Sequence, residues 1–208
     1  MDTNGLYRLQ KQDAEKLSCL LAECFVQDPL YCELIPDEAK RRKMLPELFD
    51  CEMDDLFENC EIYADSPAIN GIVIVSDESE PYNAFTYYLK SLFYTLKTGA
   101  CLVKDDPSLA TLSNFVRGRD YLSEAWTDDI SSDERLHIIY LAVRPAMQGH
   151  GIAAKLMRAV LAKADERHLL ISLETHNAHN VEIYKHFGFS VFEVLQKHFA
   201  LKQYCMVR

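Results

Sequence analysis

The sequence lacks several features that would assign it to a familiar class. No apolar run is long enough to cross a bilayer. The first residues, Met1 to Asn4, are polar and show no basic-then-apolar signal-peptide pattern. The seven cysteines form no Cys-x-x-Cys pair and have no His nearby at metal-ligand spacing. We therefore expect a cytoplasmic protein with reduced thiols, no metal site and no membrane partner.

Positive charge is also scarce. The net charge is −10, which argues against a nucleic-acid partner. Residues 1–135 carry 13 Lys and Arg against 27 Asp and Glu, a balance of −14, whereas residues 136–208 carry 9 against 5, a balance of +4. This asymmetry suggests a C-terminal part suited to an anion and an N-terminal part suited to a cation.

Hydrophobic periodicity predicts a mixed α/β fold in one domain, 1–208, with a helical insertion at about 80–134. Predicted strands are 6–9, 61–64, 71–75, 136–143, 169–173, 189–195 and 199–206. Predicted helices are 13–25, 37–57, 83–97, 107–126, 151–167 and 177–187. The strand–helix–strand unit from 136 to 173 implies parallel neighbours, and the last two strands are expected to be antiparallel. Asp28-Pro29 is expected to break the first helix.

Two clusters have open interpretations. The basic run Lys40 to Lys43 indicates a solvated helix face more readily than a phosphate site. The insertion is rich in aromatic residues, which form either an acceptor-site wall or the apolar face of two packed helices. These aromatics are Tyr82, Tyr87, Tyr88, Phe93, Tyr94 and Trp126.

The segment from Gln148 to Ala154 lies between a predicted strand and a predicted helix. Its two glycines, Gly149 and Gly151, let the backbone approach a ligand closely. The first amides of the helix have no intrahelical partners, and with the helix dipole they favour an anion such as a pyrophosphate. Nearby cations (Arg144, His150, Lys155 and Arg158) can add positive charge.

The same loop satisfies the dinucleotide fingerprint Gly-x-Gly-x-x-Ala, with Glu174 about 20 residues further on. In that fold the first glycine follows its strand directly, whereas here Arg144 to Gln148 intervene. Only 34 residues follow Glu174, too few for the further parallel strands that the fold needs. The dinucleotide interpretation is therefore the weaker one.

A second motif lies at Asn177 to Phe189. Asn180 and Tyr184 are four residues apart and share one helix face, and Gly188 suits the left-handed position after a helix end. From spacing alone, Tyr184 is equally well a packed aromatic side chain with a solvated hydroxyl.

Together these residues resemble the GCN5-related N-acetyltransferase family. Gln148, Gly151 and Ala153 match its signature Gln/Arg-x-x-Gly-x-Gly/Ala, after the strand Tyr140-Leu141-Ala142-Val143 with Pro145. The later Asn-x-x-x-Tyr followed by Gly-Phe is met by Asn180, Tyr184, Gly188 and Phe189. The resemblance is clear over about Leu136 to Val194.

The resemblance implies a twisted sheet splayed open by acetyl-CoA, which serves as cosubstrate. The primary amine of a small molecule or of a peptide attacks the thioester directly. The residues it implies for cofactor binding are Leu141, Ala142, Val143, Gln148, Gly149, His150, Gly151, Ile152, Ala153, Ala154 and Asn180. Tyr184 is implied as the general acid that protonates the departing thiolate.

The general base is left open between three candidates. His137 lies on the cofactor strand, where arylalkylamine members of the family carry histidines, and an unperturbed imidazole titrates near neutral pH. Glu174 ends the next strand, although it can equally cap the helix at Asn177. A water chain is the third candidate. The acidic N-terminal part suggests a cationic small-molecule acceptor, and a non-catalytic acyl-CoA-binding module is the alternative function.

Overall fold

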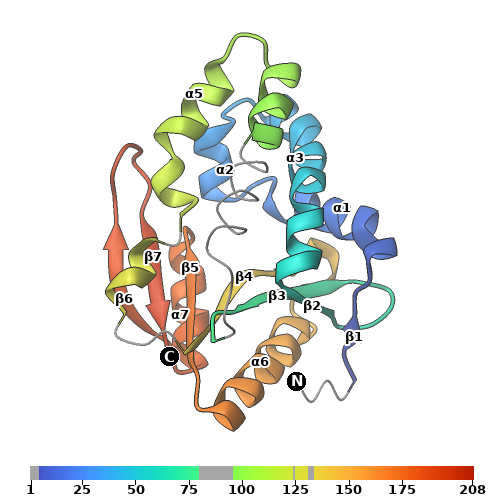
Figure 1. Ribbon diagram of the computed structural model, residues 1–208, viewed down its shortest axis with the longest axis vertical. Helices are drawn as coiled ribbons and strands as arrows, with labels where there is room; N and C mark the ends of the chain where they lie inside the picture. The colour runs from blue at the N-terminus through green and yellow to red at the C-terminus, as the bar shows by residue number, and fades with distance from the viewer. Residues whose placement is uncertain (1–4, 80–95, 124, 131–133) are drawn as a thin grey trace.

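The computed structural model describes residues 5–79, 96–123, 125–130 and 134–208, and these form a mixed sheet with helices on both faces (Figure 1). The strands are β1 (Tyr7–Arg8), β2 (Glu61–Ala64), β3 (Gly71–Asp77), β4 (Arg135–Val143), β5 (Leu170–Thr175), β6 (Ser190–Leu195) and β7 (Gln203–Val207). The α-helices are α1 (Ala14–Phe25), α2 (Pro29–Leu34), α3 (Glu38–Asn59), α5 (Ala110–Arg117), α6 (Ile152–Arg167) and α7 (Ala178–His186), with a further helical segment at 96–105. Short 3₁₀ turns are η1 (Lys11–Asp13), η2 (Arg119–Tyr121), η3 (Ala125–Asp129) and η4 (Pro145–Met147).

The sheet runs in the order β1-β2-β3-β4-β5-β7-β6. β4 and β5 are parallel, joined by α6, whereas the other neighbouring pairs are antiparallel. The predicted α/β class, the parallel pair and the antiparallel closing strands are therefore confirmed. A single parallel pair beside the loop is too few for the dinucleotide fold, so that alternative is not supported.

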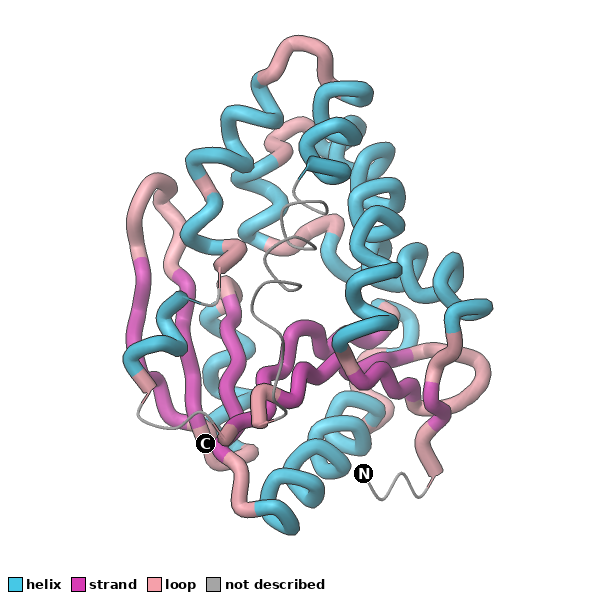
Figure 2. The backbone as a smooth tube through the Cα atoms, in the orientation of Figure 1, coloured by secondary structure: helices cyan, strands magenta, loops and turns pink. Residues whose placement is uncertain are grey.

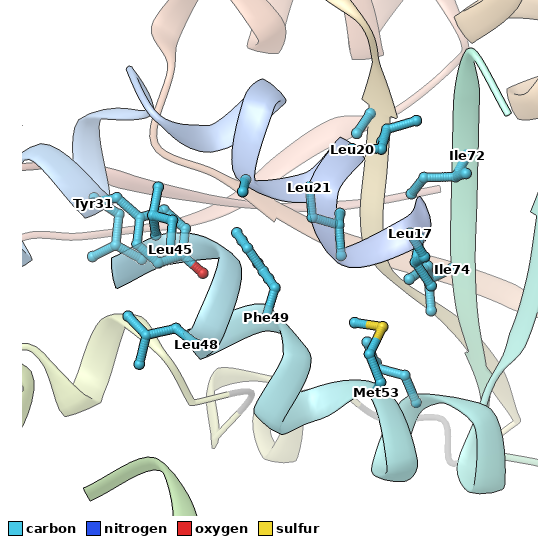
Figure 3. Close-up of a cluster of buried hydrophobic side chains, with 14 of the residues drawn as sticks. Leu17, Leu20, Leu21, Tyr31, Leu45, Leu48, Phe49, Met53, Ile72 and Ile74 are labelled. Carbon is cyan, nitrogen blue, oxygen red and sulfur yellow. The ribbon is translucent and has the colours of Figure 1, made fainter. Parts of the chain in front are cut away.

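One face of the sheet is covered by α1 and α3. Leucines of α1, such as Leu17 and Leu21, pack against Leu45 and Phe49 of α3 (Figure 3). The same cluster includes Ile72 and Ile74 of β3. Removal of this apolar surface from water is the main favourable contribution to the packing of α1 and α3 on the sheet. It fixes α1, and therefore the chain that follows α1, against the middle of the sheet.

The other face is covered by α6 and α7, which bury Leu156, Met157 and Tyr184 against strand residues such as Val73 and Leu173. The helices shown in cyan in Figure 2 therefore lie on both sides of the strands.

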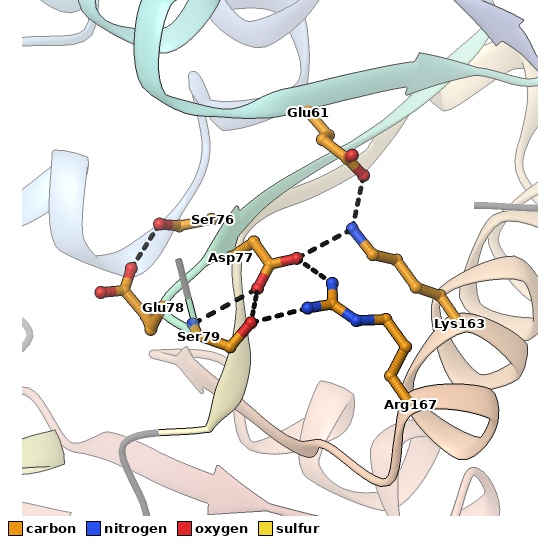
Figure 4. Close-up of polar contacts among 7 residues, drawn as sticks. All are labelled: Glu61, Ser76, Asp77, Glu78, Ser79, Lys163 and Arg167. Atoms are coloured by element: carbon orange, nitrogen blue, oxygen red, sulfur yellow. Dashed lines mark hydrogen bonds and ion pairs between the residues drawn. The ribbon is translucent and has the colours of Figure 1, made fainter. Parts of the chain in front are cut away.

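An ion cluster fixes α6 to the strands at the edge of this second core. The side chain of Lys163 is 6% exposed, and its ammonium contacts Glu61 at 2.8 Å and Asp77 at 3.2 Å (Figure 4). Arg167, one turn further on, pairs with the same Asp77 carboxylate. Lys163 bridges β2 and β3, so it sets the position of α6 along the sheet.

The two halves of the sheet diverge at its centre. β4 and β5 pair only from Arg135 to Ile138 and from Leu170 to Leu173, and beyond this point the strands separate. In Figure 1, β5, β7 and β6 turn away from β3 and β2. In the β3–β4 pairing, Ile74 faces Tyr140 and Val75 faces Ile138, so Ile139 is an extra residue in β4. Such a bulge bends the strand where the sheet opens.

Several helix boundaries differ from the sequence prediction. Asp28-Pro29 ends α1 but also starts a helix that was not predicted, because the Asp28 carboxylate accepts the Leu30 amide at 2.9 Å and caps α2. The predicted helix 107–126 is interrupted: α5 ends at Arg117 with Gly118 as its C-cap, and the separate turns η2 and η3 follow. Most of the predicted helix 83–97, with its five Tyr and Phe residues, lies outside the described residues.

The basic run on α3 is only partly a solvated face. Lys40, Arg42 and Lys43 are exposed, as expected, but Arg41 is 3% exposed. Its guanidinium donates to the carbonyls of Val26 and Ile35, both at 2.6 Å. A guanidinium carries five donors, which suits it to carbonyl groups that a loop leaves unpaired. Arg41 thus holds the α1–α2 and α2–α3 connections together.

Candidate active site

A cavity of about 690 Å³ follows the opening between the two halves of the sheet. Its walls are the end of β4 (Leu141–Val143), the loop and the start of α6, the inner side of α7, and the α1–α2 junction. We call this cavity the slot. The predicted phosphate loop, cofactor strand and Asn/Tyr helix therefore surround one space, although they are separated by up to about 45 residues in the sequence.

The loop is shaped for close approach of an anion. Gly149 and Gly151 both have positive φ, +80° and +78°, and a Cβ at either would meet nothing within 4 Å. Gly151 is the N-cap of α6 and provides no side-chain cap, so the helix leaves its first amides without a side-chain acceptor. With the helix dipole, these amides form an anion site that opens into the slot beside Ile152 and Ala153.

The side chains near the loop behave differently from the expectation. Arg144 pairs with Glu23, and Lys155 donates to the Gly5 and Asp65 carbonyls at 2.6 and 2.8 Å. Arg144 and Lys155 are thus engaged by the protein itself, whereas Arg158 is exposed on α6. Gln148 lines the slot, but its side-chain amide donates to the Val143 carbonyl at 3.2 Å and fastens the loop to β4.

His150 is the one predicted cofactor residue whose side chain the structure places away from the slot. It is exposed, and its Nδ1 lies 3.0 Å from the Gln148 carbonyl oxygen.

The predicted helix residues face the slot from α7. Asn177 caps that helix itself, accepting the His179 amide at 3.0 Å, so Glu174 is not the cap. Asn180 lines the slot and donates to Thr175 Oγ1 at 3.4 Å. Tyr184 is 8% exposed and its ring contacts Phe189, with ring centroids 5.8 Å apart.

The Tyr184 hydroxyl has no hydrogen-bond partner among the described residues, although the residue lines the slot. Burial, with the nearby Glu174 carboxylate, raises the pKa of Tyr184 to about 12. The phenol therefore stays protonated at neutral pH and can donate a proton into the slot.

The two predicted base residues form a buried group behind the slot. His137 is 1% exposed; its Nδ1 lies 2.8 Å from Ser172 Oγ and its Nε2 lies 3.3 Å from Glu174 Oε2. Glu174 Oε2 is buried and has no hydrogen-bond partner among the described residues. Neither His137 nor Glu174 lines the slot.

Sequence analysis missed a carboxylate that does line the slot, Asp28. It lies at the α1–α2 junction beside His176. Burial raises the pKa of Asp28, opposed by His176 and by backbone amides, whereas burial lowers the pKa of His176. His176 also lies 3.2 Å from Gln203 Oε1. The available signal was the Asp-Pro helix start after an amphipathic helix, which indicates the cap but not the space that it faces.

Comparison with models of protein families identifies the family of this chain. Residues 71–189, more than half of the chain, match the model of the acetyltransferase (GNAT) family. The chain belongs to this family. No match was found among curated proteins.

Solved structures of the family share the fold at low sequence identity. An acetyltransferase from Corynebacterium glutamicum has a TM-score of 0.63 and 16% identity, over 97% of this chain and 93% of its own. Arylalkylamine N-acetyltransferase 2 from Aedes aegypti has a TM-score of 0.60 and 12% identity, over 98% and 97%. Polyamine N-acetyltransferase from Drosophila melanogaster has a TM-score of 0.54 and 15% identity, over 98% of both chains. Among the described helices, none combines the length and apolar character needed to cross a bilayer.

Proposed function

We propose that the protein is an acetyl-CoA-dependent N-acetyltransferase acting on a primary amine of a small molecule. The observation that carries this proposal is the slot, where an anion-binding loop and a proton-donating tyrosine line one cavity. The open space around Gly149 and Gly151 fits a pyrophosphate, and the part of the slot lined by Leu141–Val143 would take the pantetheine arm. Acetyl-CoA supplies an activated thioester.

The chain supplies orientation and proton transfer. The loop amides and the Leu141–Val143 backbone hold the cosubstrate, and Asn180 contacts it from α7. The amine attacks the thioester carbon, so a C–N bond forms and the C–S bond breaks. Tyr184 donates its proton to the leaving sulfur, and a carboxylate takes the proton of the amine.

For that carboxylate we favour Asp28, because it lines the slot and its raised pKa makes it a stronger base than an exposed aspartate. Glu174, with His137 behind it, is the second candidate. Asp28 and Glu174 also place negative charge near the slot, which favours a cationic acceptor. The Drosophila relative acts on polyamines according to its name, and the Aedes relative on arylalkylamines.

The first experiment is calorimetric titration with acetyl-CoA, with NAD as the comparison ligand, followed by thiol-release assays with an amine panel. We expect saturable binding of acetyl-CoA alone and turnover with at least one amine. Preferential binding of NAD would refute the cosubstrate. Binding of acetyl-CoA without turnover of any amine would instead support the acyl-CoA-binding module.

The base is tested by Asp28→Asn and Glu174→Gln. Asn keeps the side-chain oxygen that caps α2, so the fold is retained. We expect Asp28→Asn to lower kcat/KM by about 10²–10⁴-fold without weakening acetyl-CoA binding. Asp37→Asn, which changes the exposed cap of α3 in the same way, is the matched control. If Glu174→Gln loses more kcat/KM than Asp28→Asn, Glu174 rather than Asp28 is the base.

A further inference from the structure

Glu52, on α3, is a carboxylate that the proposed chemistry does not use. The Tyr140 hydroxyl donates to its Oε2 at 3.1 Å, and this is the one hydrogen bond to Glu52 within the described parts of the chain. Burial raises the pKa of Glu52 to about 7; Tyr140 opposes the shift and Asp55 adds to it. Glu52 is half-buried, and a carboxylate in such surroundings is costly to ionise unless a cation pairs with it.

Glu52 lies beside a group of four aromatic rings. Phe25 of α1, Tyr31 of α2, Phe49 of α3 and Tyr140 of β4 contact one another with ring centroids 5.4 to 6.1 Å apart. Tyr140 belongs to this group and also bonds the carboxylate. Aromatic faces with a carboxylate are the surroundings in which proteins bind ammonium groups, because the rings attract the cation and replace its water.

This aromatic group reaches from Glu52 to the slot. Phe25 is a wall residue of the slot, and Tyr140 directly precedes Leu141, another wall residue. Tyr31 lies close to both carboxylates: burial raises its pKa most, and Glu52 and Asp28 both raise it further. Glu52 is therefore linked to the wall of the slot through two rings, since Tyr140 bonds the carboxylate and also contacts Phe25.

Phe49 and Tyr31 are buried, whereas Phe25 and Tyr140 are half-buried. We propose that Glu52, with the rings of Phe25 and Tyr140, binds a second, distal cationic nitrogen of the acceptor, so that the preferred substrates are diamines or other amines with a remote positive charge. This inference rests on the proposed function and names its substrate class. The near amine reacts beside Asp28, and the distal ammonium pairs with Glu52 as its counter-ion. A single-charged amine leaves Glu52 without a partner and gains nothing from it.

The test compares 1,4-diaminobutane with 4-aminobutan-1-ol, in which a hydroxyl replaces the distal ammonium at nearly the same size. Homologues of three to six carbons locate the best spacing. We expect the wild type to prefer the diamine roughly 10- to 100-fold in kcat/KM, the range for a hydrogen bond to a charged partner. Glu52→Gln should abolish the preference by raising the KM of the diamine, with the amino alcohol almost unchanged.

Two further variants separate this role from a structural one. Glu47→Gln removes a carboxylate from the same helix that pairs with the exposed Lys104, and it should leave the preference intact. Tyr140→Phe removes the hydrogen bond to Glu52 and should reduce the preference only in part.

The outcomes distinguish the two proposals. If no amine is acetylated by the wild type, the proposed function fails. If amines are acetylated but the wild type does not prefer diamines at any chain length, the inference is overturned while the transferase assignment stands. Equal losses for diamine and amino alcohol in folded Glu52→Gln overturn it as well, because they indicate damage to the site in general. The wild-type comparison decides the matter even if that variant does not fold.

Discussion

Replacement of Tyr184 by Phe is the sharpest test of how the slot performs chemistry. The change removes one hydroxyl that has no hydrogen-bond partner in the described structure, and it keeps the ring that packs on Phe189. Stability and acetyl-CoA affinity should therefore change little. Turnover should fall, because Tyr184 is the buried hydroxyl that α7 places in the wall of the slot.

The size of the effect follows from the role. General acid catalysis by a positioned side chain typically contributes about 10²–10⁴-fold, or about 3–5 kcal/mol of barrier. With the pKa of Tyr184 raised to about 12 by burial and Glu174, the acid form persists through the alkaline range. The wild type should show no loss of kcat from this group below about pH 11, and the Phe variant should be slow at every pH.

The assay measures thiol release at saturating acetyl-CoA, with calorimetry for affinity. Tyr63→Phe is the matched control, since Tyr63 is a buried tyrosine of the same apolar cluster that does not line the slot. If Tyr184→Phe keeps kcat within about threefold of wild type, Tyr184 is only a packed aromatic, and the leaving thiolate needs no protonation by this residue.

Two further predictions concern the loop and the ion cluster. Gly151→Ala should destabilise the protein by about 1–2 kcal/mol, because φ is +78° at this position, and it should also weaken acetyl-CoA binding. Gly99→Ala is the control, since Gly99 lies in open space and has no positive φ. Urea melts measure the stability of each variant, and calorimetry measures its affinity for acetyl-CoA. Lys163→Met should cost about 3 kcal/mol at pH 7, the low end for a broken buried pair, since Arg167 still pairs with Asp77. Burial opposes ionisation of Asp77, but hydrogen bonds from Ser79, Arg167 and Lys163 outweigh it and lower the pKa of Asp77. Its stabilisation is therefore complete above the unfolded pKa of about 3.9 and is lost as the pH falls through the folded pKa, so the difference between wild type and variant should shrink below about pH 4 in urea melts.

The sequence allows the sheet and the loop to be predicted because they rest on local rules. Alternating apolar residues mark the strands, and the distance from Leu136 to Leu173 requires a crossover helix and hence a parallel pair. Gly188 was assigned a left-handed position and has φ of +90°. Each of these is a property of residues that are close together in the chain.

The polar part of the site was less predictable because it depends on contacts between distant segments. Asp28 and Tyr184 are more than 150 residues apart, and no spacing rule relates them. In the sequence, Glu52 is one of many acidic residues on α3. Its contact with Tyr140, 88 residues later, distinguishes it from the others only in the folded structure. Arg41 similarly looks like part of a solvated run, yet the carbonyls of two connections enclose it. Burial of a charge is decided by tertiary packing, which periodicity does not encode.

The extra residue in β4 has a consequence for how this enzyme family member can diverge. Before Ile139, even-numbered residues such as Leu136 and Ile138 face the α6 side of the sheet; after it, Tyr140 and Ala142 face the α1 side. One inserted residue has thus reversed the inside–outside assignment of half a strand, and it brings a phenol next to Glu52 without moving any helix. Deleting Ile139 would swap Tyr140 and Leu141 between two chemical environments at once. A single deletion or insertion at this position would therefore exchange which side chains face the α1 side of the sheet, with no substitution needed.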